Sequence, residues 1–164
     1  MSQETHPQHV LWTLQELKAV FAGETDDASR GPTEAQGVIN RVTIDSRQVE
    51  PGDLFIALAG DPGQRFTPSK RTTADGHDYV ADAASKGASA ALVSRPQSAA
   101  IPQFQVQNTY DGLWMLGAAA RRRIKGPVIA VTGSSGKTTA KTFLSAALGA
   151  YAPPGSLNNH IGVP

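Results

Sequence analysis

A short loop of glycine, serine, lysine and threonine at residues 132–139 (TGSSGKTT) constrains this chain more than any other feature. It follows the apolar run 128–131 (VIAV) and precedes the stretch 140–149, whose apolar residues recur at helical spacing. Small residues let backbone N–H groups wrap around a phosphate, and the positive end of the following helix adds to the attraction. The order strand, loop, helix therefore predicts a phosphate-binding unit of an α/β fold.

Two side chains of this loop predict nucleotide chemistry. Lys137 could reach the terminal phosphates of a nucleotide, and the hydroxyl of Thr138 could bind Mg²⁺. The spacing departs from the usual phosphate loop, because the first glycine would fall at Val131 and is found at Gly133 instead. The alternative is a plain Gly-Ser turn with a solvated lysine. The apolar strand before the loop and the amphipathic helix after it favour phosphate binding.

The composition excludes several classes of protein. The 164 residues carry 15 Lys and Arg against 14 Asp and Glu without a basic block, which argues against a nucleic-acid partner held by counterion release. The absence of cysteine excludes disulfides, thiolate nucleophiles and cysteine-ligated metal sites. No apolar run approaches the roughly 18 residues of a membrane span, and the polar N-terminus lacks the features of a secretory signal. We therefore expect a cytoplasmic protein without a membrane span.

Apolar periodicity predicts strands and helices before the loop. Thr13 and Glu16 form a capping box, which predicts the start of a helix over 14–22. Strands are predicted at 38–44, 53–58, 88–93 and 104–106, and helices from Tyr79 to a stop at Gly87 and over 110–124. Residues 1–9 are expected to be disordered, and the polar segment 60–76 to be a functional or mobile loop.

A domain boundary is predicted at Gly126 and Pro127, which interrupt the helical pattern. Residues 10–125 form one expected domain, whereas residues 126–164 hold one strand, the loop and one helix. One strand and one helix do not make a complete α/β domain, because the strand lacks a partner. The apolar stripe of the helix would also need a further surface to cover it.

Five segments along the chain carry a resemblance to a known family. They are 45–60 (DSRQVEPGDLFIALAG), 75–79 (DGHDY), 86–88 (KGA), 131–139 (VTGSSGKTT) and 157–164 (LNNHIGVP). The segment around the loop is similar to the shortened ATP-binding loop of the Mur ligases, and the upstream segments resemble the N-terminal domain of that family. The last segment resembles the branch that adds D-alanyl-D-alanine. The resemblance extends over roughly residues 10–164, essentially the whole chain.

The resemblance implies a fold and an activity. The fold is α/β, with a small mixed-sheet N-terminal domain for a UDP-linked substrate, then the first strand, phosphate loop and helix of a P-loop ATPase domain. The activity is that of an ATP- and Mg²⁺-dependent ligase of peptidoglycan-precursor synthesis. Such a ligase adds D-alanyl-D-alanine to UDP-N-acetylmuramoyl-tripeptide through an acyl phosphate. Because the family continues beyond Pro164, the chain alone is expected to be catalytically incomplete.

The resemblance also implies which residues bind ATP. The nucleotide-binding residues would be Thr132, Gly133, Ser134, Ser135, Gly136, Lys137, Thr138 and Thr139. Lys137 and Thr138 would carry the catalytic roles, since Lys137 would neutralise phosphate charge and Thr138 would bind Mg²⁺.

Two further pairs of residues are implied for the UDP-linked substrate, each with a structural alternative. Ser46 and Arg47 would receive the uridine diphosphate; the alternative is a strand-end turn in which Asp45 caps its own backbone. Asn158 and Asn159 would face the muramoyl part of the substrate, where amides can donate and accept. Their alternative is a pair of turn asparagines after a proline-rich stretch.

Residues outside these pairs are mostly assigned structural roles. His77 matches a family histidine, but a lone histidine at a helix start is more often a structural contact. Trp12 and Trp114 are expected in the core, and 121–123 (RRR) is expected to be a solvated helix end. The segment 61–74 is expected to be an insertion near the substrate entrance.

Two other functions remain open from the sequence. One is a binding module for the UDP-muramoyl substrate whose phosphate loop is a remnant. The other is the ligase of the same family that adds the third peptide residue, against which the segment 157–164 argues.

Overall fold

The computed structural model describes residues 10–22, 37–61 and 74–153. The chain divides into two compact units, Met1–Leu116 and Gly117–Pro164, and each is considered by itself. The segment 1–9, predicted to be disordered, lies outside the described residues. The predicted boundary at Gly126 and Pro127 stays a prediction.

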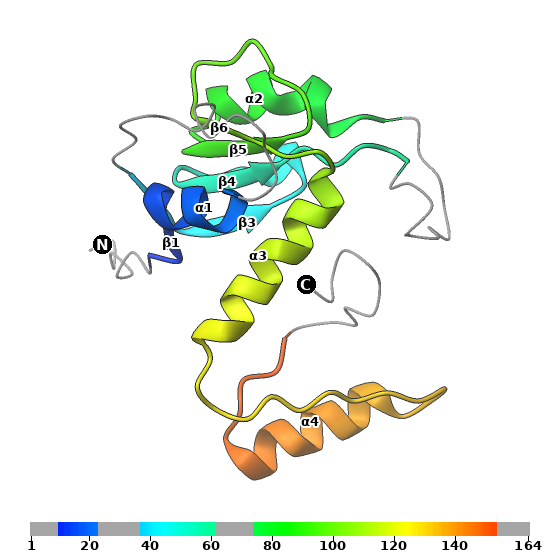
Figure 1. The fold of residues 1–164 in the computed structure, drawn as a ribbon. Helices are drawn as coiled ribbons and strands as arrows, with labels where there is room; N and C mark the ends of the chain where they lie inside the picture. Colours follow the sequence, from blue (N-terminus) through cyan, green and yellow to red (C-terminus); the bar gives the residue numbers. More distant parts are fainter. Residues whose placement is uncertain (1–9, 23–36, 62–73, 154–164) are drawn as a thin grey trace, which may run out of the picture. The chain divides into compact units, whose positions relative to one another are not determined.

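A parallel four-stranded sheet forms the centre of the first unit (Figure 1). Its strands, in spatial and sequence order, are β3 (Arg41–Thr43), β4 (Asp53–Ile56), β5 (Ala90–Val93) and β6 (Gln103–Gln105). All three neighbouring pairs are parallel. The strands predicted at 53–58 and 88–93 are confirmed with shorter bounds, and the strand predicted at 104–106 is confirmed one residue earlier.

The predicted strand 38–44 is wrong as a single element, because it divides at Asn40. Its first part, β2 (Val38–Ile39), pairs antiparallel with β1 (Trp12–Thr13), whereas β3 pairs with the parallel sheet. Between them the Asn40 amide donates to the Gly52 carbonyl at 2.9 Å. The chain changes partner at this residue, which a β-rich composition alone does not reveal.

The helix α1 (Leu14–Phe21) confirms the predicted capping box. The Thr13 hydroxyl accepts from the Glu16 amide at 3.1 Å, and a Glu16 carboxylate oxygen accepts from the Thr13 amide at 2.7 Å. These bonds satisfy two backbone donors at the helix start, so the helix begins where the sequence places it.

One face of the sheet packs against the segments that connect its strands. The connections contain two short 3₁₀-helices, η1 (Ser46–Gln48) and η2 (Gly76–Tyr79), and the helix α2 (Val80–Ser85). Phe55 of β4 lies in one buried cluster with Val80 of α2, and Ile101 from the β5–β6 connection packs against that cluster. Crossovers between parallel strands are almost always right-handed, so sequential strands place all their connections on one face.

The opposite face packs against α1 and against the part of α3 (Thr109–Arg123) that belongs to the first unit, up to Leu116. The rings of Phe21 and Phe104 lie 5.7 Å apart between α1 and β6. On α3, a Cβ added at Gly112 would lie 2.8 Å from the Leu92 side chain of β5, so this glycine permits close packing of helix on sheet. Strands covered on both faces are almost continuously apolar. Every residue of β4 and β5 is buried, and all are apolar except Asp53 at the start of β4.

The second unit contains the helix α4 (Lys137–Leu148), close to the predicted bounds. The predicted strand at 128–131 is wrong: these residues form no strand. A parallel strand needs neighbours, and the described part of the second unit contains no strand with which it could pair. Among the helices that the structure describes, none is long and apolar enough to cross a membrane.

Candidate functional site

The carboxyl ends of the parallel strands bring several chemistry-bearing segments to one edge of the sheet. They are the turn 45–48 after β3, 57–60 after β4, 94–95 after β5, and 106–108 after β6. In open α/β sheets, ligands bind outside this edge. The predicted substrate residues Ser46 and Arg47 therefore lie where the fold favours a ligand.

The turn after β3 is stabilised by Asp45 and Arg47. An Asp45 carboxylate oxygen accepts from the Arg47 amide at 3.0 Å, which is the capping geometry of the structural alternative. The Arg47 guanidinium also donates to both carboxylate oxygens, from Nε at 2.8 Å and from Nη2 at 2.7 Å. These hydrogen bonds lower the pKa of Asp45 to about 2. The Arg47 side chain is still 84% exposed, so the cap does not remove its guanidinium from solvent.

Ser46 is buried in the same turn, and its carbonyl accepts a hydrogen bond from Lys86 at 2.8 Å. Lys86 lies in the segment 86–88, one of those that resemble the family, and the resemblance implied no role for it. The two residues are 40 positions apart, and no local pattern in the sequence indicates such a contact.

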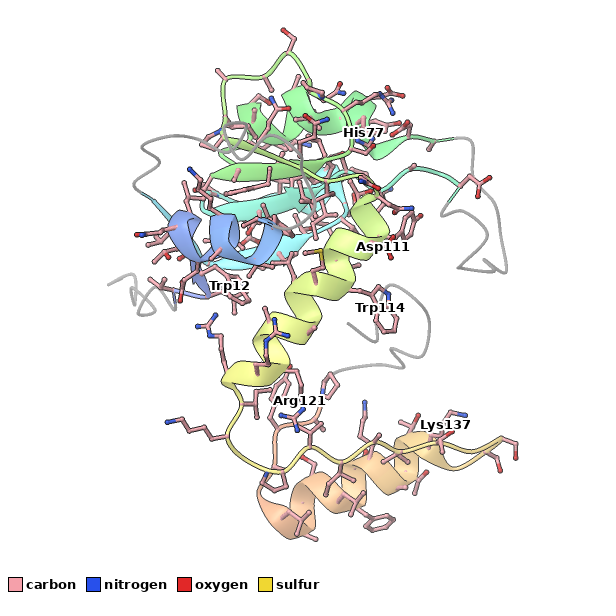
Figure 2. All side chains as sticks on the ribbon, in the orientation of Figure 1. Trp12, His77, Asp111, Trp114, Arg121 and Lys137 are labelled. Atoms are coloured by element: carbon pink, nitrogen blue, oxygen red, sulfur yellow. The ribbon has the colours of Figure 1, made fainter. Side chains whose placement is uncertain are left out.

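His77 is a buried structural contact, as the sequence analysis expected (Figure 2). Its Nδ1 lies 2.6 Å from an Asp75 carboxylate oxygen, and its Nε2 accepts from the Ser94 amide at 2.8 Å. Burial raises the pKa of Asp75, but hydrogen bonds from the His77 amide, Arg95 and the His77 ring outweigh burial and lower that pKa to about 2. The cluster joins η2 to the end of β5.

Tyr110 holds the segment that leaves β4. Its hydroxyl donates to the Ala59 carbonyl at 2.7 Å, and burial raises the pKa of this phenol. The predicted insertion 61–74 follows directly, but its residues 62–73 lie outside the described part of the chain. Asn158 and Asn159 also lie outside it.

The phosphate loop precedes α4 in the second unit, and Figure 2 shows Lys137 at the beginning of that helix. Two glycines have positive φ, +146° at Gly133 and +77° at Gly136, conformations that side chains with a Cβ rarely adopt. Lys137 folds back, and its ammonium donates to the Gly133 carbonyl. Thr138 is exposed beside it.

The loop fits a phosphate group. Gly136 is the N-cap of α4, and no side chain caps that end of the helix. The first amides of the helix therefore remain available to an anion, and the helix dipole favours negative charge there. Lys137 supplies a cation at the same end.

The described residues supply fewer candidate ligands for Mg²⁺ than donors for a phosphate group. No group of three or more His, Cys, Asp or Glu side chains lies together in the described ranges. The Thr138 hydroxyl is one possible oxygen ligand. Mg²⁺ commonly takes only one or two ligands from a protein and the rest from phosphates and water, so this single hydroxyl is compatible with such an ion.

The two tryptophans differ in their environment. Trp12 is 4% exposed and belongs to the core, as expected. Trp114 is 37% exposed, so its predicted core position is wrong. On α3 it occupies a helical position between the buried residues Gly112 and Leu116, and helical periodicity turns it away from their face. The arginines at 121–123 are exposed, as predicted.

A family model described as the Mur ligase family, catalytic domain, matches residues 38–122, just over half of the 164 residues. This range includes the entire parallel sheet and the Ser46–Arg47 turn. The chain belongs to the Mur ligase family.

Curated relatives indicate one branch of that family. The UDP-N-acetylmuramoyl-tripeptide–D-alanyl-D-alanine ligase of Escherichia coli K12 is 37% identical over 156 residues, covering 93% of this chain and 30% of the relative. The enzyme of the same name from Mycobacterium tuberculosis H37Rv is 32% identical over 178 residues, covering 93% of this chain and 33% of the relative. The chain thus spans about a third of the length of these relatives.

Solved structures indicate the same branch of the family. A crystal structure of MurF from Acinetobacter baumannii superposes with a TM-score of 0.70 at 38% identity, over 92% of this chain and 31% of that chain. MurF from Thermotoga maritima in complex with ADP superposes with a TM-score of 0.58 at 32% identity, over 75% of this chain and 28% of that chain. The α/β fold is therefore that of a Mur ligase, and one solved relative holds an adenine nucleotide.

Proposed function

We propose that this chain contributes to the ligation of D-alanyl-D-alanine to UDP-N-acetylmuramoyl-tripeptide, an ATP-dependent step of peptidoglycan-precursor synthesis in the cytoplasm. The observation that carries the proposal is the similarity to ligases of that name, which extends over 93% of the chain and includes the phosphate loop. In this proposal the chain supplies a substrate-binding domain, residues 10–125, and the beginning of an ATP-binding domain, residues 126–164.

The uridine diphosphate would bind at the carboxyl edge of the sheet. Arg47 offers an exposed guanidinium there, already oriented by Asp45, and such a planar donor suits phosphate oxygens. The buried Ser46 adjoins it in the same turn. Asn158 and Asn159 would contact the muramoyl part of the substrate.

The phosphates of ATP would bind at the start of α4. The loop residues 132–136 would surround them with amides and small side chains, and Lys137 would leave the Gly133 carbonyl to neutralise phosphate charge. Thr138 would provide one ligand to Mg²⁺, and Thr139 would stand in the first turn of the helix. When bound, Mg²⁺ would neutralise phosphate charge.

The proposed reaction has two steps. The tripeptide carboxylate attacks the γ-phosphorus of ATP, which forms an acyl phosphate and releases ADP. The amine of D-alanyl-D-alanine then attacks the acyl carbon, so that an amide bond forms and inorganic phosphate and a proton leave. In phosphoryl transfer the protein works mainly by positioning the reactants and neutralising charge. The roles of Arg47 and Lys137 are of this kind.

Calorimetry with UDP-N-acetylmuramoyl-tripeptide tests the first site. We expect measurable binding that Arg47→Ala weakens by about tenfold or more, the value of a charge-assisted hydrogen bond. Arg122→Ala, which removes an exposed arginine of α3, should leave the affinity unchanged. Equal effects of the two substitutions, or no binding by the wild type, would contradict the assignment.

Calorimetry with Mg-ATP tests the second site. We expect weak binding, because residues 128–131 form no strand that could support the loop. Lys137→Ala should abolish it, whereas Lys125→Ala, at an exposed lysine of the same unit, should not. Loss of binding in both variants would indicate nonspecific charge attraction.

The unpaired segment 128–131 also favours a second candidate function, that of a module that binds the UDP-linked substrate without catalysis. Tight UDP-ligand binding together with complete absence of ATP binding would support this alternative.

A further inference from the structure

The C-terminal end of α2 holds the connection between β3 and β4 at two places. At one place Lys86 donates from Nζ to the Ser46 carbonyl at 2.8 Å. At the other, the Gly52 amide donates to the Gly87 carbonyl at 3.1 Å, and a Cβ added at Gly87 would lie 3.2 Å from the Pro51 Cα. The first contact is made by a side chain and the second by backbone, so a substitution can remove the first alone.

The ammonium of Lys86 is itself oriented. It donates to the Asp82 carboxylate at 2.8 Å, one helical turn earlier on α2. A lysine ammonium has three donors, so this ion pair and the bond to Ser46 form together without competition. The Asp82 carboxylate restrains the long, flexible side chain of Lys86, and Nζ stays within hydrogen-bond distance of the Ser46 carbonyl.

The Ser46 carbonyl depends on this contact because of the shape of its turn. In η1 the Gln48 amide donates to the Asp45 carbonyl at 3.0 Å, which closes the beginning of the turn. The carbonyls of so short a helix take donors from outside it: Arg41 donates from Nη2 to the Gln48 carbonyl, as Lys86 does to that of Ser46. Ser46 is only 8% exposed, and a buried carbonyl is costly to leave without a donor.

We propose that Lys86 is a positioning residue for the uridine diphosphate site: by holding the Ser46 carbonyl, it fixes where the Ser46 hydroxyl and the Arg47 guanidinium stand. This inference rests on the proposed function, which assigns the two residues to that ligand. Asp45 orients the guanidinium from within the turn, and Lys86 joins the buried Ser46 of that turn to α2. The positive charge of Lys86 also contributes to the lowered pKa of Asp45, which is consistent with its place beside the turn.

The test compares Lys86→Met, Lys86→Arg and the matched control Lys18→Met, which makes the same chemical change on an exposed residue of α1. Calorimetry with UDP-N-acetylmuramoyl-tripeptide should show about tenfold weaker binding for Lys86→Met. Lys86→Arg should recover most of the affinity, because a guanidinium can donate to both the carbonyl and the carboxylate. Lys18→Met should bind like the wild type.

A double-mutant cycle separates positioning from general destabilisation. Because Lys86 acts through Ser46 and Arg47, the double variant Arg47→Ala with Lys86→Met should lose less affinity than the sum of the losses of the two single variants. Additive losses would overturn the inference, as would unchanged binding by Lys86→Met. Melting temperatures measured alongside should fall by only several degrees, the cost of one buried carbonyl without a donor, since the backbone contacts of Gly52 and Gly87 persist.

Hydrogen exchange without ligand distinguishes failure of this inference from failure of the proposed function. Lys86→Met should speed exchange at the Arg47 and Gln48 amides, whose bonds to Asp45 define the turn, and leave β5 unchanged. Unchanged exchange at the turn overturns the inference even if the wild type binds the ligand. A third outcome is faster exchange at the turn in Lys86→Met although the wild type does not bind the ligand. This outcome overturns the proposed function and the assigned ligand, whereas the contact between Lys86 and the turn is confirmed.

Discussion

At the scale of single residues, Asp75 links the acid stability of the first unit to a buried histidine. Its carboxylate accepts from the His77 amide at 2.9 Å and from Arg95 at 2.8 Å, and its pKa falls to about 2 from an ordinary value of 3.8. A carboxyl with a lowered folded-state pKa stabilises the fold above its unfolded pKa and loses that contribution as the pH falls through the folded value. The contribution is therefore lost between about pH 4 and pH 2.

We predict that Asp75→Asn lowers the free energy of unfolding by about 1–2 kcal/mol at pH 7, because charge-assisted bonds become neutral ones. The difference from wild type should shrink as the pH falls from about 5 towards about 2. Urea unfolding at a series of pH values measures this difference in the free energy of unfolding. The control is Asp78→Asn, at an exposed aspartate of η2, for which the difference should stay small at every pH. A pH-independent difference for Asp75→Asn would contradict the assigned titration.

At the scale of elements, η2 lies in close contact with the residues that directly follow β4. The Gly76 amide donates to the Leu58 carbonyl at 2.8 Å. A Cβ added at Gly76 would lie 2.7 Å from the Leu58 amide nitrogen and 2.9 Å from the Ala57 carbonyl carbon. These are backbone atoms, so they cannot move aside as a side chain could. The glycine is therefore required for close approach of two segments.

Gly76→Ala should lower the free energy of unfolding by about 1–3 kcal/mol, the usual cost of overpacking a close contact. Gly126→Ala is the matched control, because a Cβ there would meet nothing within 4 Å, and its effect should stay within about 0.5 kcal/mol. Chemical denaturation of both variants gives the comparison. If Gly76→Ala were as stable as the control, the approach of η2 to β4 would have to be looser than described.

Elements governed by local pattern were predictable from the sequence, whereas those governed by distant partners were not. The capping box placed α1, and apolar runs placed β4 and β5, because those signals reside within a few residues. The division at Asn40 and the absence of a strand at 128–131 depend on which other strands are available. In the candidate site, the family-like segment 45–60 predicted the Ser46 turn. The contact from Lys86 to that turn was not predictable, because it spans 40 positions in the sequence.

At the scale of the whole molecule, the two units differ in how their secondary structure is supported. The first unit has a parallel sheet buried on both faces. In the second unit, α4 has no buried residue, and its Phe143 and Leu148 are 71% and 59% exposed. An isolated helix shorter than about 12–15 residues is marginal in water, because nucleation is costly and tertiary packing supplies most helical stability. The 12 residues of α4 fall within that limit.

We therefore predict that backbone amides of α4 exchange with solvent at least about a thousandfold faster than those of β4, as expected for local fraying against global unfolding. Exchange followed by mass spectrometry on the same sample gives both rates and the internal reference. The substitution Phe143→Ser should leave exchange in α4 unchanged, because an exposed ring contributes no packing that could be lost. Protection of α4 equal to that of β4, lost in Phe143→Ser, would mean that another surface covers the apolar face of this helix. Protection of α4 could come from a surface that covers its apolar face or from phosphates bound at Lys137. Addition of Mg-ATP separates the two, because bound phosphates would slow exchange in the first turn of α4 more than at its far end.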